Sequence, residues 1–192
     1  MRVYGNTESG NCLKVKWVCK HLAIPYEWIE TSGLDGTTRK PEFLKINPMG
    51  QVPAIMLDDG RTLAQSNAVM RYLARGSALI PSDAFDAAKM DEWLFWEQYS
   101  HEPYIAVCRA ELLFRGKKPS ELDPGRVQRG YAALALMEGH LATRQFFVAS
   151  SLTLADVALL AYTRVAREGN FDLAPYTNVR RWIGVSERAL RL

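Results

Sequence analysis

Residues 47–68 limit the possible folds of this chain more than any other segment. They read N-P-M-G-Q-V-P-A-I-M-L, then the turn D-D-G, then R-T-L-A-Q-S-N-A. Two short apolar runs joined by Asp-Gly predict a β-hairpin, and the helical spacing of apolar residues after Ser66 predicts that a helix begins there. Such a segment can hold a small peptide through the backbone of one strand and through the helix N-terminus, which attracts carboxylates.

The Val52-Pro53 pair lies in the first of the two predicted strands. Proline lacks an N–H group, so it occurs at strand starts or edges. A cis X-Pro bond is far less costly than other cis bonds, and here it would turn the N–H and C=O of Val52 out of the strand ladder and toward a ligand. An extended peptide could then pair with Val52 as a strand does. The trans form is more frequent overall, so Val-Pro alone leaves both isomers open.

Ser66 has two interpretations at the start of the predicted helix. A helix N-terminus presents unpaired N–H groups and a partial positive charge, so the Ser66 hydroxyl and the N–H groups of Ser66 and Asn67 could bind a carboxylate. Serine is also a favoured N-cap residue, in which case it satisfies only the donors of its own helix. The local pattern favours the N-cap interpretation, and the position of Val52-Pro53, one hairpin away, weakens that preference, so both interpretations stay open.

Length, charge and cysteine content narrow the class of protein. The 192 residues suit one large domain or two small ones, and the net charge of +3 is too weak to indicate a nucleic-acid partner. No apolar run approaches the roughly 18 residues of a membrane span, so we expect no membrane partner. Three cysteines without a CxxC pair suit a reducing compartment, which predicts a soluble, cytoplasmic protein.

The pattern of elements changes along the chain. Residues 1–76 have the predicted order β-α-β-α-β-β-α, and Gly76 to Asp83 reads as a linker. Beyond it only helices are predicted: over 84–114 with a possible kink at Pro103, over 124–143, from Thr153, and over 176–190. The spacing of Thr153 and Asp156 predicts a capping box. The predicted fold class is an α/β domain over 1–76 followed by an all-α domain over 84–192.

The motifs N-P-M-G-Q-V-P-A, L-x-Q-S-N-A-V-x-R-Y-L-A and T-L-A-D-V-A, in this order and spacing, make the chain resemble the glutathione transferase superfamily. The match runs over nearly the whole chain. The first half resembles the thioredoxin-like, glutathione-binding domain of that family, and the second half resembles its helical domain, which carries the electrophile pocket. The resemblance implies a homodimeric detoxification enzyme that joins glutathione, its co-substrate, to small apolar electrophiles.

The resemblance also assigns residues to the glutathione site. It implies a cis bond at Pro53, with Val52 pairing backbone to backbone with the cysteinyl part of glutathione. It implies that Ser66 binds the γ-glutamyl carboxylate, with Gln65 beside it. Many relatives have Glu or Asp at the Gln65 position, so Gln65 keeps an acceptor but lacks the charge that strengthens a hydrogen bond. Further candidate contacts are Gln51 and, for the glycine carboxylate or as a solvated basic loop, Arg39 or Lys40.

The implied reaction is attack by the glutathione thiolate on an electrophile. A thiol with a pKa near 8.5 is mostly protonated at neutral pH, so a hydrogen-bond donor and a helix N-terminus are needed to raise the thiolate fraction. The loop before the first helix, where the family places its donor, offers Ser9 as first choice and Asn11, through its amide or backbone N–H, as second. Cys12 is the third candidate, as a nucleophile that forms a mixed disulfide with glutathione or, alternatively, as a buried packing residue.

The second domain offers candidates for the electrophile pocket, each with interhelical packing as its alternative role. They are Tyr99, Tyr104, Cys108 and Arg109. The histidines are scattered without metal-ligand spacing, and no glycine-rich phosphate loop is present, so we expect neither a metal nor a nucleotide cofactor. Three functions stay open: a glutathione transferase, a glutathione-dependent reductase or peroxidase using Cys12 or the bound thiol, and a non-catalytic binding protein of the same fold.

Overall fold

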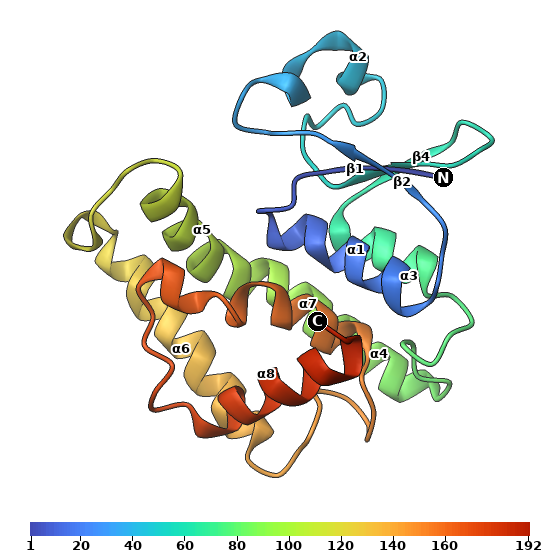
Figure 1. Ribbon diagram of the computed structural model, residues 1–192. Helices are drawn as coiled ribbons and strands as arrows, with labels where there is room; N and C mark the ends of the chain where they lie inside the picture. Colours follow the sequence, from blue (N-terminus) through green and yellow to red (C-terminus); the bar gives the residue numbers. More distant parts are fainter. The chain divides into compact units, whose positions relative to one another are not determined.

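The computed structural model describes residues 1–192, which divide into two units, Met1–Ile80 and Pro81–Leu192. The first unit contains a four-stranded sheet with helices, and the second contains helices and no strand (Figure 1). This arrangement confirms the predicted fold class, an α/β part followed by an all-α part.

The sheet of the first unit has the order β2-β1-β3-β4. Strand β1 (Arg2–Gly5) pairs in parallel with β2 (Glu27–Glu30) and antiparallel with β3 (Ala54–Met56). Strand β3 pairs antiparallel with β4 (Thr62–Ala64) through the predicted Asp-Gly turn. The parallel pair requires a crossover connection between its strands, and the helix that follows β1 supplies it.

Helices α1 (Gly10–His21) and α3 (Ser66–Leu73) lie on one face of this sheet, and the short α2 (Pro41–Leu44) lies on the other side (Figure 1). The core of the unit forms where apolar residues of α1 and α3 meet the sheet. These fully buried residues are Val3, Val15, Cys19, Ile55 and Val69. Packing against the sheet therefore fixes the N-termini of α1 and α3 relative to the strands.

The helices of the second unit surround one buried helix. Every residue of α7 (Leu154–Thr163) is buried. The other helices are α4 (Ala84–Trp96), α5 (Glu102–Leu113), α6 (Pro124–Leu141) and α8 (Thr177–Leu190). A helix that is covered on every side and mostly apolar, as α7 is, belongs in the interior of a helical unit.

The helix predicted over residues 84–114 is interrupted. Glu97–His101 form a π-helical turn between α4 and α5, and Pro103 lies in the first turn of α5. Proline has no N–H to donate to the carbonyl four residues before it, and its ring crowds that carbonyl, so a regular helix cannot continue through it. The predicted kink at Pro103 is therefore realised as a wider turn just ahead of the proline.

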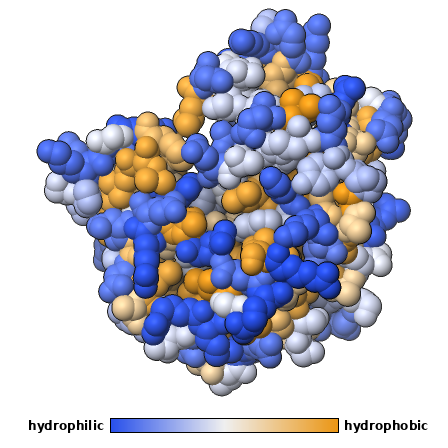
Figure 2. Space-filling view, viewed as in Figure 1, coloured by the Kyte–Doolittle hydropathy of each residue, from blue (hydrophilic) through white to orange (hydrophobic).

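The surface seen in Figure 2 mixes polar and charged side chains with separate apolar patches. Several large apolar side chains of the second unit are exposed, and Phe95 and Tyr99 are the most exposed of them, at 78% and 82%. No helix combines the length and the apolar character needed to cross a membrane.

Candidate glutathione site

Three loops of the first unit meet at one end of the strands. In the strand register Tyr4 faces Ala54, and Ala54 faces Ala64. The chain just after β1, just before β3 and just after β4 therefore lies at this end of the strands. These three segments carry the predicted donor loop, the Val-Pro pair and the start of α3, so the topology brings the predicted site residues of the first unit together.

The peptide bond between Val52 and Pro53 is cis, as the resemblance implied. Strand β3 begins at Ala54, so Val52 and Pro53 precede it, although both were predicted to lie within the strand. The N–H and C=O of Val52 consequently lie outside the ladder, and no hydrogen bond within the protein uses them. They are unpaired main-chain groups just before β3, and an extended peptide can pair with them.

The loop that leads into Val52 is held by one buried side chain. Asn47 donates from Nδ2 to the carbonyl oxygen of Gln51 at 2.7 Å and accepts from the N–H of Met49 at 3.1 Å. Asn47 is 2% exposed, so these bonds are shielded from water. The backbone direction at Val52 is thus set before any ligand arrives.

Ser66 is the first residue of α3 and is almost fully buried. The N-cap position belongs to Gln65, whose backbone has a φ of 69° and whose side chain makes no capping hydrogen bond. The interpretation of Ser66 as a plain N-cap is therefore wrong. Its hydroxyl instead donates to Oδ1 of Asn11 at 3.1 Å, which links the N-terminus of α3 to that of α1.

Asn11 lies in the first turn of α1 and has a second partner that sequence reasoning missed. The Lys14 ammonium donates to Asn11 Oδ1 at 2.8 Å, and Lys14 is fully buried. Residues three apart on a helix are neighbours on its surface, so the Asn-x-x-Lys spacing was the signal in the sequence. The burial of Lys14, which makes the contact unusual, could not be read from that spacing.

Ser9 and Cys12, the other two candidates of the donor loop, lie at different depths. Ser9 is the half-buried N-cap residue of α1, and its side chain makes no capping bond. Cys12 is fully buried, and burial raises the pKa of its thiol more than hydrogen bonds with the Asn6 backbone and the Ser9 side chain lower it. The structure thus favours the packing interpretation of Cys12 over a reactive thiolate.

The remaining predicted glutathione contacts border the loop at Met49. Arg39 donates from Nη1 to the carbonyl oxygen of Met49 at 3.4 Å, and Gln65 Nε2 lies 3.6 Å from the Met49 sulfur. Gln51 is exposed in the same loop, and Lys40 is exposed at the N-cap of α2. Arg39 is therefore the basic residue with a defined contact to this loop, while Lys40 has none.

The four predicted pocket residues of the second unit also differ in depth. Tyr99 is exposed in the π-helical turn, whereas Cys108 is fully buried in α5. Burial raises the pKa of the Cys108 thiol, which suits a packing residue, and its contact with an electrophile stays a prediction. A role for Tyr99 in an electrophile pocket stays a prediction.

Tyr104 and Arg109, also on α5, each have a charged partner. The guanidinium of Arg129 lies 5.7 Å from the centre of the Tyr104 ring, which is within the range of a cation–π interaction. Arg109 forms an ion pair with Glu168 and is mostly covered. These partners account for part of each side chain's position, and contact with an electrophile stays a prediction for both.

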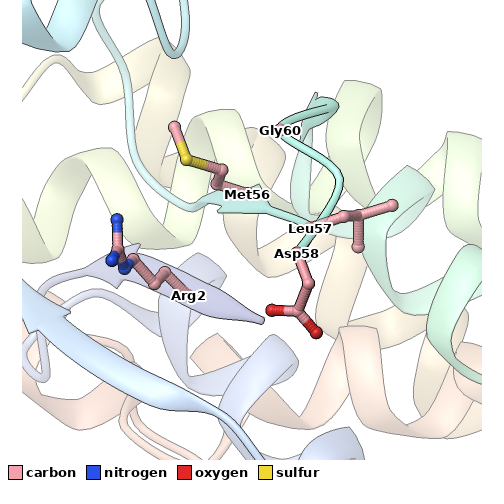
Figure 3. Close-up of a pocket in the computed structure, with 5 residues that line it drawn as sticks. All are labelled: Arg2, Met56, Leu57, Asp58 and Gly60. Atoms are coloured by element: carbon pink, nitrogen blue, oxygen red, sulfur yellow. The ribbon is translucent and has the colours of Figure 1, made fainter.

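A separate pocket of about 220 Å³ lies at the opposite end of the sheet (Figure 3). Arg2 faces Met56 in the register, and the hairpin residues Leu57, Asp58 and Gly60 complete the lining. The Asp58 carboxylate accepts from the N-terminal amine at 2.7 Å. This pocket contains none of the predicted site residues, so it is distinct from the other end of the strands, which carries Val52 and Ser66.

The mixed sheet with a cis-proline directly before β3, followed by an all-helical unit, defines a two-domain protein with a thioredoxin-like first half. Comparison with known families agrees with this assignment. The model of the glutathione S-transferase N-terminal domain matches residues 8–75, and that of the C-terminal domain matches residues 96–185. The chain belongs to the glutathione transferase superfamily.

Individual relatives resemble nearly the whole chain. It is 31% identical to glutathione S-transferase 3 of Zea mays, over 95% of this chain and 86% of that protein. A glutathione S-transferase structure from Pseudomonas fluorescens is 41% identical, with a TM-score of 0.94 and coverage of 97% of this chain and 94% of that one. One from Xanthobacter autotrophicus is 40% identical, with a TM-score of 0.90 and coverage of 97% and 92%.

Proposed function

We propose that this protein is a glutathione transferase that joins the thiolate of glutathione to small apolar electrophiles. The observation that carries the proposal is that the unused main-chain groups of Val52, just before β3, and the buried Ser66, just after β4, follow strand ends that are paired in the register. The names of the relatives at 31% to 41% identity support the same activity.

Glutathione would lie extended across this end of the strands. Its cysteinyl part pairs with the N–H and C=O of Val52, and its γ-glutamyl carboxylate meets Ser66 at the N-terminus of α3, where the helix dipole favours an anion. Gln65 lies beside that end, and Arg39, which donates to the Met49 carbonyl, would meet the glycine carboxylate. The first unit carries ten Lys and Arg against seven Asp and Glu, which suits an anionic tripeptide.

The chemistry needs the thiol proton removed and the resulting anion stabilised. The thiol passes its proton to water, the thiolate sulfur forms a bond to an electrophilic carbon of the second substrate, and a leaving group departs from that carbon or a conjugated double bond accepts the electron pair. The N-terminus of α1 and a donor on Ser9 or Asn11 raise the thiolate fraction. Ser9 is the N-cap residue of α1 and Asn11 lies in its first turn, and these positions support both as donors.

The reductase alternative through Cys12 has less support. That chemistry requires an accessible thiolate, whereas the Cys12 thiol is fully buried and its pKa is raised. All three cysteines are free thiols, which supports a reducing compartment such as the cytoplasm, where glutathione is reduced. A role in detoxification follows as part of the same proposal.

We also propose that the protein forms a homodimer through its second unit. A small groove of about 210 Å³ lies between the α4–α5 region and α6, lined in part by Trp96, Tyr104 and Leu136. The exposed side chains of Phe95 and Leu136 belong to the same helices. Exposed apolar patches of this kind mark interaction sites, and a second copy of the chain presents the same patch.

The proposed activity is tested by glutathione titration calorimetry and by conjugation of chlorodinitrobenzene. We expect Ser66→Ala to weaken glutathione binding about 10- to 100-fold, because a hydrogen bond to a charged group contributes about 1.5–3 kcal/mol. Ser77→Ala is the matched control, since the Ser77 hydroxyl bonds only to main-chain groups near it in the sequence, donating to the Ala74 carbonyl and accepting from the Leu79 N–H. Failure of the wild-type protein to bind glutathione would refute the proposal and favour a non-catalytic binding protein.

A further inference from the structure

We propose that Gly50 is a positioning residue for the terminal carboxylate of glutathione, because its missing side chain leaves the space in which the Arg39 guanidinium lies. This inference rests on the proposed function and assigns a role to a glycine of the loop before Val52. Gly50 acts through Arg39, and the consequence is a preference for glutathione over an analogue without that terminal charge.

The Arg39 side chain lies directly against the main chain of Gly50. A Cβ atom at position 50 would lie 2.8 Å from Arg39 Nη1 and 3.3 Å from Arg39 Cδ. It would also lie 3.0 Å from the carbonyl oxygen of Thr38, which is buried. Non-bonded heavy atoms attract one another at about 3.5–4.0 Å and repel at shorter distances. Any larger residue at position 50 would therefore displace the Arg39 side chain, which is exposed and can move.

The backbone conformation of Gly50 gives a second reason for glycine, and it can be separated from the first. Gly50 has a φ of 62°, in the left-handed region that glycine adopts without steric cost. Gly60, in the turn between β3 and β4, has a φ of 85° and no atom within 4 Å of its Cβ position. A substitution at Gly60 thus carries the backbone strain without the collision, which makes it the matched control for Gly50.

Arg39 carries a positive charge that no carboxylate of the protein neutralises. Its guanidinium has five N–H donors, and Nη1 donates to the Met49 carbonyl oxygen at 3.4 Å. No Asp or Glu forms a salt bridge with Arg39. The remaining donors can therefore bind a carboxylate, whose two oxygens match the planar fork of an arginine.

The place of Arg39 relative to Val52 selects which carboxylate it meets. The loop that Arg39 contacts is held by the buried Asn47, whose main-chain carbonyl accepts from the N–H of Gly50 at 2.9 Å. Arg39 is thereby tied to the loop that ends at Val52, where the cysteinyl part of glutathione pairs. Ser66 takes the γ-glutamyl end, so the carboxylate at the opposite end of an extended tripeptide is the one left for Arg39.

Calorimetric titration with glutathione and with its glycine amide, in which a neutral carboxamide replaces the terminal carboxylate, tests the inference. We expect the wild-type protein to bind glutathione about tenfold more tightly, the lower end for a hydrogen bond to a charged group because Arg39 is exposed. Gly50→Ala should remove that preference and leave the affinity for the amide unchanged, whereas Gly60→Ala should change neither. Gly50→Asn should repeat the selective loss with less backbone strain, since asparagine tolerates the left-handed region.

A double-mutant cycle shows whether Gly50 acts through Arg39. Arg39→Met should remove the same preference, and Gly50→Ala should cause no further loss in that background. An equal loss for both ligands in Gly50→Ala, or a full additional loss in the double variant, would overturn the role of Gly50 and leave the proposed function intact. A wild-type protein that binds the two ligands equally would do the same. A wild-type protein that binds neither ligand would overturn the proposed function as well.

Discussion

At the scale of single residues, adjacent positions of α1 differ in chemistry because their burial and their hydrogen-bond partners differ. Asn11 and Cys12 are adjacent in the first turn of α1. Asn11 is half-buried and hydrogen-bonded to Ser66 and Lys14, whereas Cys12 is fully buried. The sequence named both as candidates for contact with the thiol, and only their different depths in the fold separate them.

The burial of Cys12 predicts that its thiol does no chemistry. We expect Cys12→Ser to leave conjugation unchanged and iodoacetamide to alkylate Cys12 more slowly than free glutathione at neutral pH. Burial raises the pKa of the Cys12 thiol, so its thiolate is the minor form below that raised pKa and increases only as the pH rises toward it.

Mass spectrometry after timed alkylation measures this, with Cys19 on the same helix as the matched control. Burial raises the pKa of Cys19 to about 11, so it should react slowly as well. Fast alkylation of Cys12 alone, together with loss of activity in Cys12→Ser, would revive the reductase function.

At the scale of elements, the start of α7 shows which contacts of one residue a local motif predicts and which it does not. The capping box predicted from Thr153 and Asp156 is present, with the Thr153 N–H donating to Asp156 at 2.9 Å. The same carboxylate also accepts from the N–H of Phe147 at 3.0 Å and from Nε1 of Trp182 at 2.9 Å. A spacing of three residues predicted the first contact, while the other two depend on how the loop before α7 and helix α8 pack.

The number of buried groups that donate to the Asp156 carboxylate predicts how much Asp156 contributes to the free energy of unfolding. We expect Asp156→Ala to lower the free energy of unfolding by at least about 3 kcal/mol, since each buried donor left unpaired costs about 1–3 kcal/mol. Asp123→Ala is the control, because Asp123 is the exposed N-cap of α6 and accepts from the N–H of Gly125.

Urea denaturation followed by circular dichroism compares the two variants. The loss for Asp123→Ala should be about 1 kcal/mol, the usual value for an N-cap. Equal losses for the two variants would show that the contacts of Asp156 beyond its own helix contribute nothing.

At the scale of the whole molecule, the sequence predicted a homodimer only through the family resemblance, and the structure adds a surface that suits one. Phe95 is exposed on α4, and Leu136 is half-exposed on α6 beside the groove of the second unit. Helical periodicity places both residues on helices. Exposure depends on which faces the neighbouring helices cover, so it could not be read from the pattern alone.

The dimer proposal predicts a mass of about twice 21.7 kDa in analytical ultracentrifugation. We expect Leu136→Glu to shift the protein to the monomer, because an uncompensated charge would be buried in the interface. Leu34→Glu is the control, since Leu34 is exposed in the first unit. A monomeric wild-type protein, or a dimer that tolerates Leu136→Glu, would contradict this interface.

The sequence by itself determined the order of the elements, the hairpin, the helix at Ser66 and the capping box, because each depends on residues a few positions apart. It also placed Val52 and Ser66, whose motifs lie within one hairpin. Only the tertiary structure decided that Ser66 bonds to Asn11, 55 residues away, and that Lys14 is buried against them. Such contacts depend on how α1 and α3 pack on the sheet, which no local spacing records.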